Sequence, residues 1–124
     1  AARLVDATPK EALADLPALA GVPMTLKDSL DTAGVRTTAG TVGRSRRVPT
    51  LDSSVAARLA KAGAILVAKS STPELTLAFE TDNDVVGRTS NPYDVRRMPG
   101  GSSGGAGALV AAGASPLDLG TDYG

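Results

Sequence analysis

Residues 99–113 read PGGSSGGAGALVAAG, and this stretch constrains the fold more than any other part of the chain. Paired glycines flank two adjacent serines, Ser102 and Ser103, and a run of small apolar residues follows at once. A flexible Gly/Ser linker is one interpretation of such a composition. The continuation GALVAAGAS, residues 107–115, is instead typical of a buried helix. We therefore expect the glycines to lead into a packed part of the protein.

Two functional interpretations of the glycines stay open at this point. Glycines that open a helix expose N–H groups to a phosphate, but the phosphate-binding loop pattern ends in Gly-Lys-Ser/Thr, and no lysine follows here. Residues 100–104 also satisfy the Gly-x-Ser-x-Gly pattern of a nucleophilic serine on a strand-to-helix turn. The preceding DVRRMP does not read as a strand, and the chain contains no histidine to act as base. The serine pattern is thereby weakened without being excluded.

The composition removes several classes of function. The 124 residues carry 13 basic and 13 acidic side chains, so a nucleic acid or an anionic membrane is not the expected partner. The chain has no cysteine and no histidine, which argues against disulfides and against a zinc site. No apolar run approaches the roughly 20 residues of a membrane span. We expect a cytoplasmic protein that acts on small polar or neutral molecules and needs no metal or organic cofactor.

Local patterns predict an α/β protein. A strand, a helix and a second strand that follow one another over short distances build a parallel sheet with helices against it. Two long loops rich in polar residues and glycine separate the elements, and long ordered loops are usually functional. The predicted elements are a helix over 9–16 capped by Thr8 with Glu11, a strand over 21–26, a helix over 52–63, a buried strand over 64–68 and a short helix that starts at STPEL, residues 71–75, with Thr72 as cap.

Serine chemistry within this chain needs a base other than histidine. A lysine can serve near neutral pH only if burial lowers its pKa from about 10.4. Lys27, at the end of the strand GVPMTL, fits this requirement better than Lys10, Lys61 or Lys69. A solvated lysine at a strand end is the plain alternative, and the carboxylate of Asp28 would keep Lys27 charged unless it points away.

Three segments together resemble the amidase signature family of serine hydrolases. They are GVPMTLKDSLDTAGVRTTAGT at 21–41, GRTSNPYD at 87–94 and PGGSSGGAGALVAAGASPLDLGTDYG at 99–124. FETDNDVVGRTSNPYD is most similar to the bacterial amidases and the fatty-acid-amide-hydrolase-like branch. The resemblance implies the amidase signature fold, an α/β domain with a mixed central sheet flanked by helices. Residues 1–124 would be the N-terminal part of one such domain, truncated at its C-terminus.

The resemblance also assigns site residues. The family uses a triad of serine, a serine after a cis peptide bond, and lysine, with the nucleophilic serine expected two residues beyond Gly124. Asp122 would brace the turn around the oxyanion hole. By position, the family roles fall on Lys27 and Ser102 as catalytic residues, Gly101 and Ser103 as their support, the backbone N–H groups of Tyr123 and Gly124 as part of the oxyanion hole, and Thr76 near the substrate.

The activity that this resemblance implies is hydrolysis of a small-molecule amide through an acyl-enzyme, in a full-length protein that could be a homodimer. One alternative is the A subunit of a glutamine-dependent aminoacyl-tRNA amidotransferase, a relative with the same site residues. An alternative of another class is a non-catalytic ligand-binding or scaffolding piece. The arginines at 44, 46, 47, 96 and 97 are expected to be surface charges in loops.

Overall fold

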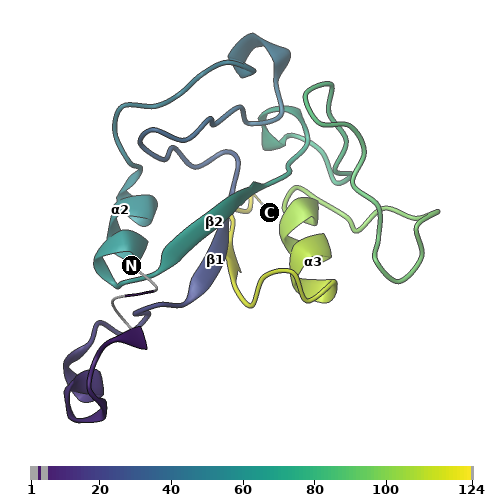
Figure 1. The fold of residues 1–124 in the computed structure, drawn as a ribbon. Coiled ribbons are helices and arrows are strands. Elements are labelled where there is room, and N and C mark those ends of the chain that lie inside the picture. The colour runs from purple at the N-terminus through teal and green to yellow at the C-terminus, as the bar shows by residue number, and fades with distance from the viewer. Residues whose placement is uncertain (1–2, 4–5, 124) are drawn as a thin grey trace.

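The computed structural model describes residue 3 and residues 6–123, and it has the α/β architecture that the sequence predicts (Figure 1). The strands form one three-stranded sheet in the order β2-β1-β3. In chain order, the elements are η1 Lys10–Asp15, β1 Pro23–Lys27, η2 Val42–Arg44, α2 Ser54–Lys61, β2 Ile65–Ser70, η3 Glu74–Thr76, α3 Gly104–Ala111 and β3 Asp118–Leu119, where η marks a 3₁₀ helix.

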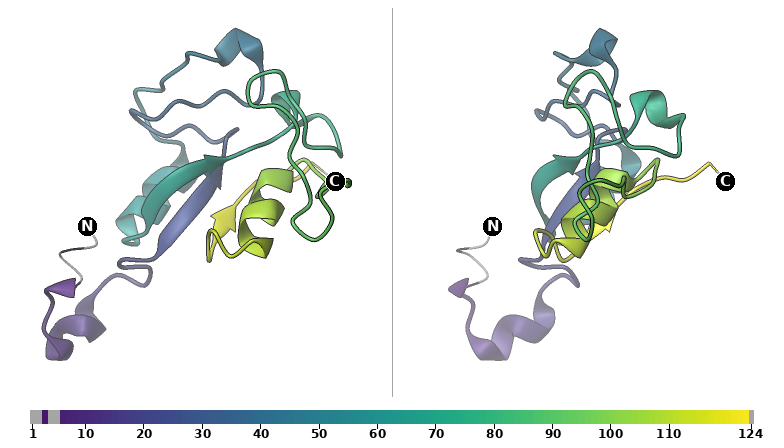
Figure 2. Two further views of the ribbon diagram at one scale, coloured as in Figure 1. Left: turned by 45° about the vertical axis from the view of Figure 1, so that its right-hand side comes forward. Right: turned by 90° about the vertical axis from the view of Figure 1, so that its right-hand side faces the viewer.

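The central strand β1 positions everything else. It pairs in parallel with β2 on one side and with β3 on the other. Because side chains alternate between the two faces of a strand, Met24 and Leu26 point to one face and Thr25 and Lys27 to the other. The apolar face packs with Ala56 of α2, whereas α3 lies on the opposite side of the sheet (Figures 1 and 2). The face that carries Lys27 is thus the face that α3 covers.

Helix α2 forms as the sequence predicts. Ser53 occupies the N-cap position, where its Oγ accepts a hydrogen bond from the backbone N–H of Ala56 at 3.3 Å. Leu59, on the same face as Ala56, packs against the buried Met24 and Leu26. This apolar cluster is small because the chain supplies mostly alanine, valine and leucine for it.

Several predicted elements differ from the observed ones. The helix expected over 9–16 is a six-residue 3₁₀ helix with Pro9 at its N-cap. The strand after α2 ends two residues later than expected, at Ser70, and as an edge strand it leaves Val67 56% exposed instead of buried. All the described strands pair in parallel, so this part of the sheet lacks the antiparallel pairing that a mixed sheet requires.

The segment after β2 differs most. The helix expected from STPEL is a single 3₁₀ turn, and Pro73 rather than Thr72 stands at its N-cap. Leu75 and Thr76 have φ of 50° and 64°, in the left-handed region, which prevents an α-helix from continuing through them. Helix α3 is less buried than its composition predicts, since its buried residues are Gly104 and Gly105 and Val110 is 46% exposed. Among the described residues, no helix has the length and apolarity needed to cross a membrane.

Candidate active site

Lys27 lies at the centre of the candidate site. It is the last residue of β1, and none of its surface is exposed to solvent. Its Nζ lies 2.7 Å from Ser102 Oγ and donates to the carbonyl of Thr121 at 2.7 Å. The predicted pair of Lys27 and Ser102 is therefore brought together by the fold, and the solvated strand-end alternative for this lysine is wrong.

The loop that carries Ser102 is held by two buried threonines. The Gly101–Ser102 peptide bond is cis, as the family resemblance implies. Thr72 Oγ1 donates to the carbonyl of Ser102 at 3.0 Å, and Thr81 Oγ1 donates to the carbonyl of Gly100 at 2.8 Å. Thr81 Oγ1 also accepts from the N–H of Gly104 at 3.1 Å, which satisfies one donor at the start of α3. Sequence reasoning missed both roles, because a threonine in a polar loop gives no local signal of burial.

Glycine is required at two positions by close backbone packing. A Cβ at Gly101 would lie 2.9 Å from both the carbonyl oxygen of Ala78 and the carbonyl carbon of Phe79. A Cβ at Gly105 would collide with the backbone of Ser71. The close approach of Gly105 to the Ser71 backbone confirms the expectation that the glycines lead into a packed part of the protein. Because Gly101 and Gly105 are fixed in close packing, the linker interpretation is wrong.

Burial is the largest influence on the pKa of Lys27. Removal from water lowers the pKa of its amine, while the negative charges of Asp122 and Asp118 partly oppose this shift. Asp28, the neighbour that could have kept the lysine charged, points away: its carboxylate accepts from the N–H of Thr38 at 2.9 Å and from the Thr38 hydroxyl. The surroundings thus favour an uncharged amine more than the sequence suggests.

The partners of Nζ also define a direction for proton transfer. The carbonyl of Thr121 can only accept, so an N–H of Lys27 must point to it. In the neutral amine the lone pair is then available to the hydroxyl of Ser102. Ser103 Oγ donates to the same carbonyl at 3.3 Å, so Ser103 contacts the group that orients the lysine. This arrangement can carry a proton from Ser102 Oγ to Lys27 Nζ.

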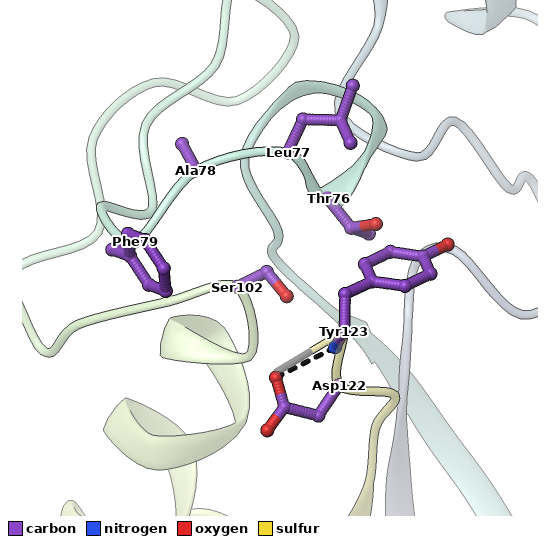
Figure 3. Close-up of a pocket in the computed structure, with 7 residues that line it drawn as sticks. All are labelled: Thr76, Leu77, Ala78, Phe79, Ser102, Asp122 and Tyr123. Atoms are coloured by element: carbon purple, nitrogen blue, oxygen red, sulfur yellow. Dashed lines mark hydrogen bonds between the residues drawn. The ribbon is translucent and has the colours of Figure 1, made fainter.

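A cavity of about 250 Å³ opens beside Ser102 (Figure 3). Thr76 is 5% exposed, and its Oγ1 is buried without a hydrogen-bond partner among the described residues. Figure 3 shows Ser102 between Phe79 and Tyr123. The lining is mostly apolar and consists of Thr76, Leu77, Ala78, Phe79, Ser102, Asp122 and Tyr123.

The segment expected to form the oxyanion hole is described only in part. The backbone N–H of Tyr123 donates to Asp122 Oδ1 at 2.9 Å, so this donor already has a partner in the structure. Asp122 thus contacts the N–H of the next residue, and its expected role in bracing the turn around the oxyanion hole stays a prediction. Gly124, the other residue assigned to the oxyanion hole, lies outside the described residues.

The arginines interpreted as surface charges are all exposed, and all lie in loops except Arg44, which ends η2. Arg47 forms a two-point ion pair with Asp31 at 2.5 and 2.6 Å. Arg96 and Arg97 both pair with Asp94 at the surface, at 2.9 and 3.3 Å. Exposed pairs of this kind contribute little to stability.

The chain is an α/β protein whose candidate site pairs a buried lysine with a serine and contains no histidine. Comparison with known proteins shows the family to which a chain with this fold and site belongs. The Amidase family model matches residues 1–124. The A subunit of the glutamyl-tRNA(Gln) amidotransferase of Prochlorococcus marinus (strain MIT 9303) is 47% identical over 117 residues, which cover 92% of this chain and 24% of that protein. The chain thus spans about a quarter of the length of such relatives. It belongs to the amidase family.

Solved structures agree with this assignment. The inhibitor-bound vestigial protein complex that reveals the evolutionary origins of an s-triazine catabolic enzyme matches with a TM-score of 0.83 at 40% identity, over 97% of this chain and 26% of that one. Fatty acid amide hydrolase matches with a TM-score of 0.80 at 31% identity, over 84% of this chain and 18% of that one. Both matches span most of the chain, so the likeness is one of fold and not of a single motif.

Proposed function

We propose that the protein to which this chain contributes hydrolyses small carboxamides through an acyl-enzyme, with Lys27 and Ser102 as the proton relay. The observation that carries the proposal is the 2.7 Å contact between Ser102 Oγ and the Nζ of a fully buried lysine. The nucleophile would be a serine that the family resemblance expects two residues after Gly124. Residues 1–124 would then be the N-terminal part of a single amidase domain, and the expected cytoplasmic location stays a prediction.

The relay follows from the chemistry of the two groups. Neutral Lys27 accepts the proton of Ser102 Oγ, and Ser102 accepts the proton of the nucleophilic hydroxyl as that oxygen attacks the carbonyl carbon of the amide. The proton then returns along the same path to the leaving nitrogen when the carbon–nitrogen bond breaks. Water repeats the sequence on the acyl-enzyme and releases the carboxylic acid.

Other residues would serve the bound substrate. Thr76 Oγ1, buried beside the cavity and without a hydrogen-bond partner in the described part of the chain, would hydrogen-bond the amide. The N–H groups of Tyr123 and Gly124 would stabilise the oxyanion, which requires the Tyr123 N–H to leave Asp122. Phe79 and Leu77 make the described part of the cavity apolar, which favours amides with an uncharged flank.

The second candidate is the A subunit of a glutamine-dependent aminoacyl-tRNA amidotransferase. The 47% identity to the A subunit of a glutamyl-tRNA(Gln) amidotransferase favours it. Its site chemistry is the same, but the substrate would be glutamine and turnover would depend on a partner protein. The non-catalytic alternative predicts no turnover of any amide.

The experiment measures ammonia release by the complete protein from a panel of amides that includes glutamine. We expect Lys27→Ala and Ser102→Ala each to lower kcat/KM by about 10²–10⁴-fold, the usual contribution of a positioned acid or base. Lys61→Ala, which changes an exposed lysine of α2, is the matched control and should retain full activity. Residues 1–124 alone should release no ammonia. Equal activity in all the variants would refute the relay.

A further inference from the structure

The carboxylate of Asp118 is fixed on the sheet face that carries Lys27. Asp118 begins β3 and pairs with Thr25 across the parallel ladder, so the two side chains lie on one face. Thr25, which is 2% exposed, donates from its Oγ1 to Asp118 Oδ2 at 2.5 Å. Lys27 follows Thr25 by two residues and therefore projects from the same face.

The chain after Asp118 runs along the side chain of Lys27. A Cβ at Gly120 would lie 3.4 Å from Lys27 Cδ, and the carbonyl of Thr121 accepts from Lys27 Nζ. The second carboxylate oxygen, Asp118 Oδ1, is buried and has no hydrogen-bond partner among the described residues. A buried carboxylate oxygen without a donor is costly, and a nearby ammonium is the group that compensates it.

The other charged groups around Lys27 are accounted for. Asp122 is the stronger of the two carboxylates that raise the pKa of the amine, but it lies at an exposed position beyond β3, and α3 contributes no titratable side chain. Lys69 of β2 is bound to Leu30 O and to the hydroxyls of Thr32 and Thr37, and Asp28 is bound by Thr38. Asp118 differs from Asp122 in that it belongs to a strand of the sheet and is held there by Thr25 on the lysine face.

We propose that Asp118 is a positioning residue whose carboxylate, anchored by Thr25, raises the lower pH limit at which the Lys27 relay operates. The proposal rests on the proposed amidase function. The carboxylate favours the charged ammonium and so raises the pKa of Lys27 against the effect of burial. Because the relay requires the neutral amine, removal of this charge extends activity to lower pH.

The test is the pH dependence of kcat/KM in the complete protein and in Asp118→Asn. Asparagine keeps the shape and can still accept from Thr25. We expect the acid limb of the Asp118→Asn profile to lie at lower pH than that of the wild type. At a pH on this limb, kcat/KM divided by its plateau value should be about threefold higher in the variant than in the wild type. Asp28→Asn is the matched control, because it removes a carboxylate next in sequence to Lys27 that points away, and its limb should coincide with that of the wild type.

An acid limb that is unchanged in Asp118→Asn, or that moves to higher pH, overturns the proposal. If this variant fails to fold, Asp118→Ala must shift the limb in the same direction. A wild type that hydrolyses none of the amides refutes the proposed function and not this inference. The ionisation of Lys27 is then followed directly, by NMR of lysine labelled at Cε and assigned with Lys27→Met. A titration midpoint no lower in Asp118→Asn than in the wild type would again overturn it.

Discussion

Replacement of Gly101 by alanine should disturb the site through packing alone. The new Cβ would lie 2.9 Å from two backbone atoms, the carbonyl oxygen of Ala78 and the carbonyl carbon of Phe79. Backbone atoms cannot rotate away from the new Cβ as the end of a flexible side chain can, so the loop that carries Gly101 and Ser102 must shift. Overpacking of this kind costs about 1–3 kcal/mol. A shift of the residue next to Ser102 also lengthens the 2.7 Å contact with Lys27 Nζ.

The assay compares Gly101→Ala with Gly107→Ala in the complete protein, by thermal unfolding and by amide hydrolysis. Gly107 lies inside α3, and a Cβ there meets no atom within 4 Å. Alanine at that position should stabilise the helix by about 0.5–1 kcal/mol and leave turnover unchanged. We expect the two variants to move the melting temperature in opposite directions. A Gly101→Ala protein as stable and as active as the wild type would refute the packing argument.

Two further predictions concern the groups around Ser102. Since burial lowers the pKa of Lys27, the folded state binds fewer protons than the unfolded state between the folded pKa and the ordinary lysine value, so the free energy of unfolding should rise with pH through this window. Denaturant titrations at several pH values should show a smaller rise in Lys27→Met, and an identical pH dependence would contradict the assignment. Thr81→Val removes the hydroxyl that binds both the Gly100 carbonyl and the Gly104 N–H, and should cost about 1–3 kcal/mol of stability and reduce activity. Thr81→Ser keeps the hydroxyl and should stay near the wild type, so equal losses in both variants would show that the methyl group matters instead.

Local pattern was sufficient for the secondary-structure elements whose determinants lie within a few residues. Helix α2 has its cap, apolar face and terminal glycine in one short segment, and its prediction was confirmed. The segment after β2 was mispredicted because the left-handed backbone at Leu75 and Thr76 has no sequence signature, as neither residue is glycine. The exposure of Val67 was also mispredicted, because it depends on which strand lies at the edge of the described sheet, and sheet topology is not encoded in a short segment.

Strand and helix periodicity was enough to predict the α/β class. The family and the pairing of Lys27 with Ser102 came from the resemblance of three motifs to the amidase signature family, because the two residues are 75 positions apart and no local pattern joins them. The fold was needed to show that Thr72 and Thr81 hold the serine loop, that Asp28 turns away, and that Asp118 lies on the lysine face. These contacts join residues that are distant in the chain. Their energies depend on burial and direction, which arise only when the strands pair and α3 packs against them.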